Sequence, residues 1–121
     1  MITGMGVDIV RVDRFKTWHT KSAHQLRKVF TPAEIAYCLQ TPSKTAQRFA
    51  VRFAAREAFF KALKTRLPLL TVCKALEVVV SPTGPILQVS WPALNLEPQI
   101  THLSLAHEKD MAIASVILER D

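Results

Sequence analysis

The segment Arg48–Leu63 constrains the fold most, because it is a strong helix former that is apolar nearly all round. At about 100° per residue, its phenylalanines gather on one side and its alanines continue the apolar surface beside them. Glu57 lies between these groups and Lys61 among the alanines. A buried carboxylate needs a cation beside it, which would be Lys61 one turn on or a metal ion. The alternative is an ordinary i,i+4 pair on a partly exposed face, worth roughly 0.2–0.5 kcal/mol.

The N-terminal segment contains a second candidate carboxylate, Asp8. The alternation of Ile2–Val10 predicts a strand, and one face of this strand carries only Gly4, Gly6 and Asp8. Glycine inside a strand often marks close approach of a ligand or of another backbone, so we expect space beside the Asp8 carboxylate. Together with Glu57 and the neighbouring basic residues, Asp8 is suited to a hard divalent cation and a phosphorylated substrate.

The length and composition predict one domain spanning residues 1–121. With 121 residues and 49% hydrophobic content, the chain can build one core but not two. No apolar run reaches the roughly 18 residues of a membrane span, and the N-terminus lacks the order of a signal peptide, so we expect a cytoplasmic protein without membrane contact. Cys38 and Cys73 lack the spacing of zinc sites or of a disulfide framework, which predicts free buried thiols.

The charge of the chain indicates an anionic partner. Sixteen Lys and Arg residues against ten Asp and Glu give a formal net charge of +6, and the isoelectric point is near 9.8. Nucleic acid, a phosphorylated cofactor and an acidic protein are all compatible with this balance. The basic residues are scattered, however, and no zinc-finger spacing, RNP motif or basic zipper is present, so no nucleic-acid partner is expected.

The first half of the chain is predicted to be mainly helical. Residues 12–29 have the pattern of a basic amphipathic helix, whose charged side is either a solvated face or a docking surface for an acidic partner. A helix is predicted over residues 31–39. Thr31 can serve as its N-cap, proline follows at the first helical position, and glutamate lies three residues after the cap. The polar segment 41–47 is expected to be a loop, in which Lys44 could reach a phosphate.

The second half has the pattern of strands, which we expect at residues 76–80, 86–91, 101–107 and 111–119. The order strand, helices, strands indicates an α+β fold. Single histidines in strands are more often structural than functional. His107 still receives weight as a site residue, because it ends a strand at a turn, where substrate-binding groups tend to lie.

As a set, these residues resemble the holo-[acyl-carrier-protein] synthases, which are small 4′-phosphopantetheinyl transferases. The resemblance covers nearly the whole chain in order and spacing. It rests on residues 4–10 (GMGVDIV) with Arg14, residues 30–34 (FTPAE), residues 52–62 (RFAAREAFFKA), Gly84-Pro85 and residues 102–107 (HLSLAH). It implies the transferase fold, with an antiparallel sheet packed against one long buried helix and shorter helices.

The resemblance also implies the chemistry. Members move the 4′-phosphopantetheine arm of coenzyme A to a serine of apo acyl carrier protein and release adenosine 3′,5′-bisphosphate. Asp8 and Glu57 match the positions that hold Mg²⁺. Glu57 would help remove the serine proton, and Lys61 would stabilise or protonate the leaving phosphate. The positions that match residues near the cofactor phosphates are Arg52, Lys61, Lys44 and His107.

The expected partner is acidic. Arg14 matches the basic residue that meets the carrier protein, and Lys21 and Lys28 share its predicted helix. Carrier proteins are acidic, which fits the charge of +6 through electrostatic steering. Members of the family are trimers with coenzyme A in clefts between subunits, so the resemblance implies a homotrimer.

Two departures from the family pattern bear on the site. Lys64-Thr65-Arg66 stands where the family usually has Gly-Thr-Gly, and His24 and Gln25 replace a basic and an apolar residue. Two other functions stay open from the sequence. One is a phosphate-binding or nucleic-acid-binding module without catalysis, and the other is a different Mg²⁺-dependent transferase or hydrolase acting on another nucleotide diphosphate.

Overall fold

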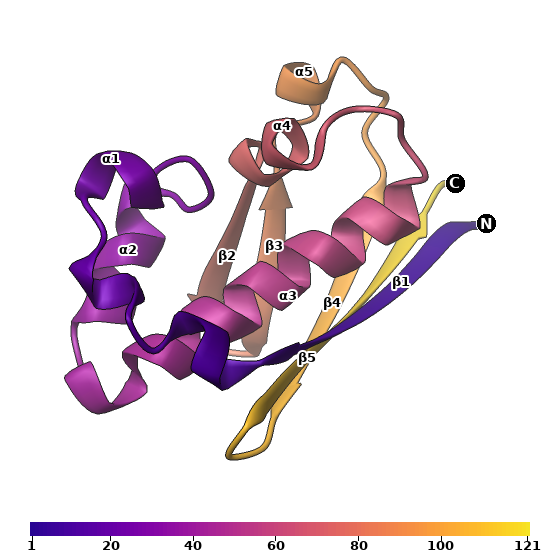
Figure 1. Cartoon of the computed structure of the whole chain (residues 1–121). Helices are drawn as coiled ribbons and strands as arrows, with labels where there is room; N and C mark the ends of the chain where they lie inside the picture. The colour runs from indigo at the N-terminus through magenta and orange to yellow at the C-terminus, as the bar shows by residue number, and fades with distance from the viewer.

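The computed structural model describes residues 1–121, and its strands form two antiparallel sheets beside one long helix (Figure 1). The larger sheet has the order β1-β5-β4, made of Ile2–Arg11, Met111–Glu119 and Ile100–His107. Strands β2 (Leu76–Ser81) and β3 (Gly84–Val89) form a separate hairpin, and β3 runs next to β4. The expected α+β class is therefore confirmed.

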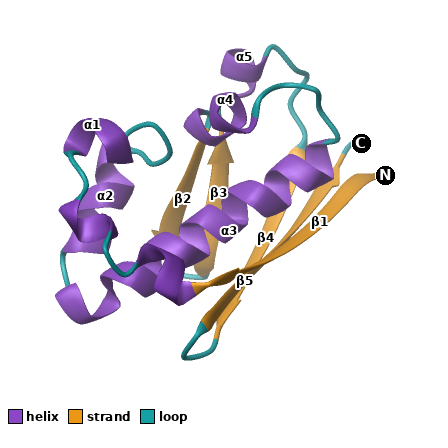
Figure 2. Cartoon of the chain, in the orientation of Figure 1, coloured by secondary structure: helices purple, strands orange, loops and turns teal.

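Helix α3 lies across one face of the larger sheet (Figure 2). It spans Thr45–Leu63, three residues longer at its start than the sequence indicates. Glycines on β1 permit the contact, since a Cβ on Gly4 would lie 1.9 Å from the Ala62 carbonyl oxygen and one on Gly6 would lie 2.0 Å from that of Ala58. The space expected beside this face of β1 is thus filled by the backbone of α3.

The single helix predicted over residues 12–29 is wrong. The structure has two short 3-10 turns, Val12–Phe15 and Trp18–Thr20, followed by helix α1 at Ala23–Leu26. A new helix begins because Ser22 forms a capping box with Gln25. The segment does not form one straight helix, because Phe15 and Trp18 pack against aromatic side chains of the core. The Phe15 ring contacts those of Trp18 and Phe53. The Trp18 ring contacts those of Phe30 and Phe49.

The helix predicted over residues 31–39 is confirmed as α2, Pro32–Leu39. The Thr31 hydroxyl accepts a hydrogen bond from the Glu34 amide, and the Glu34 carboxylate accepts one from the Thr31 amide. The loop predicted at residues 41–47 is only partly correct, because Pro42–Lys44 is a 3-10 turn that leads directly into α3.

The second half contains two short helices that the sequence pattern did not predict, α4 (Leu69–Lys74) and α5 (Trp91–Leu94). Strand β3 begins at Gly84, two residues earlier than expected, because Gly84 at φ 120° closes a tight turn. Trp91 begins α5 instead of ending β3. The hairpin of β4 and β5 is confirmed.

Both cysteines are free and buried, as expected. Burial raises the pKa of Cys38 to about 12 and that of Cys73 to about 11, so neither thiol is reactive at neutral pH. No helix is long and apolar enough to cross a membrane.

Candidate active site

The close packing of β1 on α3 brings Asp8 and Lys61 together. The Lys61 Nζ donates hydrogen bonds to Asp8 Oδ1 at 2.9 Å and to the Val7 carbonyl oxygen at 3.1 Å. The Asp8 side chain is 11% exposed and that of Lys61 is 51% exposed, so the pair lies at the protein surface with the carboxylate on the inner side. Lys61 is therefore paired with the strand, and the ordinary i,i+4 pair with Glu57 is not formed.

The two carboxylates at this site are incompletely satisfied by the protein. Asp8 Oδ2 is buried and has no hydrogen-bond partner. The pKa of Glu57 is raised, first by burial and then by the negative charge of Asp8, while Lys61 and Arg14 oppose the rise. A divalent cation would relieve both defects, because it would bind the unpaired oxygen and cancel the repulsion. Asp8 and Glu57 therefore fit the metal role predicted for them.

Arg14 borders the same site. Its Cζ lies 5.6 Å from the centre of the Phe53 ring, and its charge lowers the pKa of Glu57. The other two residues predicted to bind the partner lie further along the N-terminal segment: Lys21 has its Nζ 5.1 Å from the centre of the Trp18 ring, and Lys28 is exposed after α1.

The predicted cofactor-binding residues do not all meet at this site. Arg52 precedes Lys61 by nine residues, or about two and a half turns, so the two side chains leave α3 on opposite sides. Lys44 is exposed in the turn before α3. His107 lies against the first turns of α3, where the Gln47 Nε2 is 2.8 Å from the His107 Nδ1.

The sequence did not indicate one buried polar cluster next to the site. The Arg56 guanidinium forms two hydrogen bonds with the Glu34 carboxylate, and both side chains are almost fully buried. The same guanidinium donates to the carbonyl oxygens of Cys73 and Leu76, and Glu34 also accepts from the Val78 amide. An arginine on an apolar helix was the available signal, but its partner lies 22 residues away and no spacing rule connects them.

Comparison with known proteins identifies the family of the chain. The model of the 4′-phosphopantetheinyl transferase superfamily matches residues 4–116. The chain is 40% identical to the holo-[acyl-carrier-protein] synthase of Geotalea daltonii, over 99% of this chain and 100% of the relative. It is also 40% identical to that of Treponema denticola, over 98% of this chain and 99% of the relative. The chain belongs to the holo-[acyl-carrier-protein] synthase family.

Solved structures of the same family share the fold. The holo-(acyl-carrier-protein) synthase of Bacillus anthracis, in complex with CoA (3′,5′-ADP), matches with a TM-score of 0.82 at 31% identity, covering 100% of this chain and 99% of that one. The holo-[acyl-carrier-protein] synthase of Neisseria meningitidis matches with a TM-score of 0.78 at 28% identity, over 99% and 100% of the two chains. The chain is therefore an enzyme of this family with the expected transferase fold.

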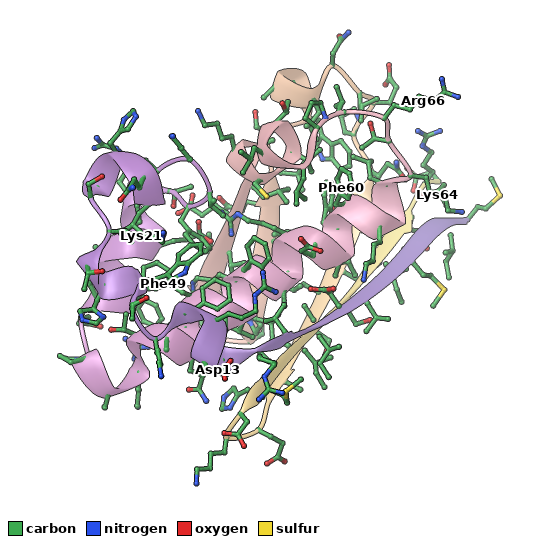
Figure 3. All side chains as sticks on the ribbon, in the orientation of Figure 1. Asp13, Lys21, Phe49, Phe60, Lys64 and Arg66 are labelled. Carbon is green, nitrogen blue, oxygen red and sulfur yellow. The ribbon has the colours of Figure 1, made fainter.

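The departure from the family pattern at residues 64–66 has a defined backbone geometry. Lys64 follows the last residue of α3 at φ 56° and ψ 41°, the left-handed conformation that glycine adopts at little cost. Arg66 is not among the residues at positive φ. Figure 3 shows Lys64 and Arg66 at the opposite end of α3 from Asp13 and Lys21. Lys64 is thus strained where Arg66 is not.

Proposed function

We propose that this chain transfers the 4′-phosphopantetheine arm of coenzyme A to a serine of apo acyl carrier protein and releases adenosine 3′,5′-bisphosphate. The observation that carries the proposal is the site at which Lys61 pairs with Asp8, whose second oxygen is unpaired, beside Glu57, whose pKa is raised. The Bacillus anthracis synthase in complex with CoA (3′,5′-ADP) supports the choice of substrate.

Mg²⁺ is the metal that suits this donor set. Asp8 and Glu57 supply hard oxygen ligands, and no group of three or more His, Cys, Asp or Glu side chains gathers anywhere in the chain. Water and phosphate oxygens would complete the coordination, as is usual for Mg²⁺ at phosphate sites. When bound, the ion would neutralise charge that develops on the pyrophosphate oxygens.

Glu57 and Lys61 have different roles in the transfer: one acts on the attacking serine and the other on the departing phosphate. The serine oxygen forms a bond to the phosphorus that carries the pantetheine arm, and the bond from that phosphorus to the bridging oxygen breaks. Glu57 accepts the serine proton, directly or through a water, and its raised pKa makes it a better base than an ordinary carboxylate. Lys61, which keeps half of its side chain exposed, stabilises or protonates the departing phosphate.

The acidic carrier protein would dock on the basic N-terminal segment. Arg14, Lys21 and Lys28 are all exposed there. The charge of Arg14 also lowers the pKa of Glu57. A carrier bound to this surface would bring its serine towards the carboxylates. The net charge of +6 would accelerate this encounter at low salt.

A homotrimer with its sites between subunits explains why Arg52 faces away from Lys61. One subunit would contribute Asp8, Glu57 and Lys61, and its neighbour would contribute Arg52 to the same coenzyme A. The larger sheet has a face available for such contacts, since the side of β1 opposite α3 exposes Met5 by 65%, Val7 by 59% and Ile9 by 56%. Exposed apolar surface of this kind marks an interface.

The decisive experiment is incubation of the protein with apo carrier protein, coenzyme A and Mg²⁺, followed by intact mass measurement of the carrier. We expect the carrier to gain one phosphopantetheine group, and chelation of the metal should prevent the gain. Binding of coenzyme A without any gain would indicate a phosphate-binding module. Release of phosphate with the carrier unchanged would indicate a different transferase or hydrolase.

A further inference from the structure

The basic N-terminal segment carries no acidic residue at any position from 14 to 33. Its possible positive charges are all on exposed side chains: Arg14, Lys16, His19, Lys21, His24, Arg27 and Lys28. The arginines and lysines keep their charge throughout the physiological range, whereas a histidine in general gains its proton only near about pH 6.5. The charge that this surface offers to an acidic partner therefore depends on pH at two of its positions.

Helix α1 directs His24 away from the core. Leu26 is buried at 2% exposure, and at about 100° per residue the positions two before and two after it lie on the opposite side of the helix. These positions are His24 and Lys28, and both are exposed. The backbone N–H of Lys28 donates to the Gln25 carbonyl oxygen at 3.2 Å, which continues the turn after α1. His24 thus lies one turn before Lys28 on the outer side of the segment.

No carboxylate of the protein neutralises the two histidines. Asp13, which precedes the segment, pairs with Arg11 at 3.5 Å, and Glu34, which follows it, is bound by Arg56. His24 takes part in no ion pair or side-chain hydrogen bond, and the same is true of the second histidine. A proton taken up by either imidazole is therefore available to a partner.

The charged groups that surround α1 are cations. Lys74 at the end of α4 lines a cavity of about 290 Å³ together with Arg27, and no carboxylate lines this cavity. Lys21 precedes α1, with its Nζ 5.1 Å from the centre of the Trp18 ring. A proton placed among like charges is stabilised by an acidic partner that binds there. Proton uptake and the binding of such a partner should consequently favour each other.

The identity of the partner rests on the proposed function, in which an acidic carrier protein docks on this segment. We propose that His24, assisted by His19, makes docking of the carrier protein dependent on pH, with the protonated imidazoles adding contacts to carboxylates of the carrier. Aspartates and glutamates stay ionised between about pH 6 and pH 8, so the change in charge lies on the enzyme. Docking should be strongest when the histidines are protonated and should weaken as pH rises and the protons are lost.

Calorimetric titration of the whole protein with apo carrier protein, without coenzyme A, tests this proposal at pH 6 and pH 8. At low salt we expect the affinity to be about threefold higher at pH 6, which is the size expected for one exposed ion pair. His24→Lys should retain the high affinity at pH 8 and lose most of the pH dependence. His24→Gln should show the lower affinity at both pH values. High salt should reduce all of these differences.

Steady-state kinetics separate docking from a merely structural role. At pH 8, His24→Lys should lower KM for the carrier and leave kcat and KM for coenzyme A unchanged. His102→Gln is the matched control, because it removes an exposed histidine of β4 and should leave the pH dependence of carrier binding as it is. Circular dichroism checks that each variant retains the fold. If His24→Lys and the unsubstituted protein showed the same ratio of affinities between the two pH values, His24 would have no such role.

The failure of this inference is distinct from the failure of the proposed function. An enzyme that modified the carrier, but whose pH dependence of docking did not respond to substitution of His24, would refute the inference alone. A protein that neither bound nor modified the carrier at either pH would refute both.

Discussion

Helix α3 carries two ion pairs that differ in how completely the protein satisfies them. The Arg56 pair with Glu34 is almost fully buried, and each carboxylate oxygen accepts from both the guanidinium and a backbone amide. In the Lys61 pair with Asp8, the lysine side chain is half exposed and Asp8 Oδ2 is unpaired, and the pair adjoins Glu57, whose pKa is raised. A satisfied buried pair specifies the fold, while an unsatisfied pair at the surface retains the capacity to bind a ligand.

The comparison predicts opposite consequences for similar substitutions. A change in the buried pair should destabilise the fold without a direct effect on chemistry. A change at the surface pair should abolish chemistry and leave the fold intact, because the protein itself does not depend on those charges. If substitutions in the two pairs had the same effect, this contrast between them would be wrong.

The largest effect is expected from Glu57→Gln and Asp8→Ala. Each removes a proposed metal ligand, so we expect transfer to fall by about a hundredfold to a thousandfold, as is usual when electrostatic stabilisation of the transition state is lost. Intact mass measurement of the carrier gives the rate, and circular dichroism verifies folding. A Glu57→Gln enzyme with full activity would exclude both the metal-ligand and the base role of Glu57.

The second effect is loss of stability in Glu34→Gln. Removal of one charge leaves the Arg56 guanidinium buried without a counter-ion, which costs about 3–5 kcal/mol. Urea unfolding measures the change, and Glu77→Gln on the adjacent strand is the control, because Glu77 forms no ion pair. If the two variants were equally stable, the buried pair would not hold the fold together.

The third prediction concerns Arg14→Glu. Reversal of this charge should raise KM for the carrier protein by about tenfold or more, and KM for coenzyme A much less. Because Arg14 lowers the pKa of Glu57, the variant should also shift the acidic limb of the kcat profile to higher pH. Equal increases in both KM values would place Arg14 in the cofactor site.

The fourth prediction is that Glu57→Gln stabilises the metal-free protein. The pKa of Glu57 in the folded state is raised above 4.5, so folding disfavours its charged form and stability falls as pH rises through that range. The gain in Tm should be complete at neutral pH and should vanish as pH falls below about 4.5. Mg²⁺ should raise the Tm of the unsubstituted protein and not that of the variant.

The smallest effect is expected after α3. Lys64→Gly should raise stability by about 1 kcal/mol, because it relieves a left-handed residue, whereas Arg66→Gly should not. Calorimetry of coenzyme A binding at two salt concentrations separates this strain from a phosphate contact. A loss of affinity in Lys64→Gly with Arg66→Gly that is larger at low salt would show that the cations bind phosphate, whereas a loss below about twofold would exclude the contact.

Local patterns in the sequence determined much of this protein. The capping box at Thr31, the hairpin at residues 101–119 and the apolar helix around Glu57 were predicted because each depends on neighbouring residues. The assignment of Asp8 and Glu57 as metal ligands, which came from the residue pattern and from the resemblance to the family, stays a prediction. The same local rules failed over residues 12–29, where aromatic packing against α3 overrides the helical pattern.

Only the tertiary structure decided which charges meet. It paired Lys61 with Asp8 and not with Glu57, bound Arg56 to Glu34 across 22 positions, and directed Arg52 to the opposite side of α3. The glycines of β1 set the first of these contacts, since they allow the backbone of α3 to approach the strand directly. Sequence spacing fixes which side of a helix a charge occupies, but its partner depends on which element packs against that side.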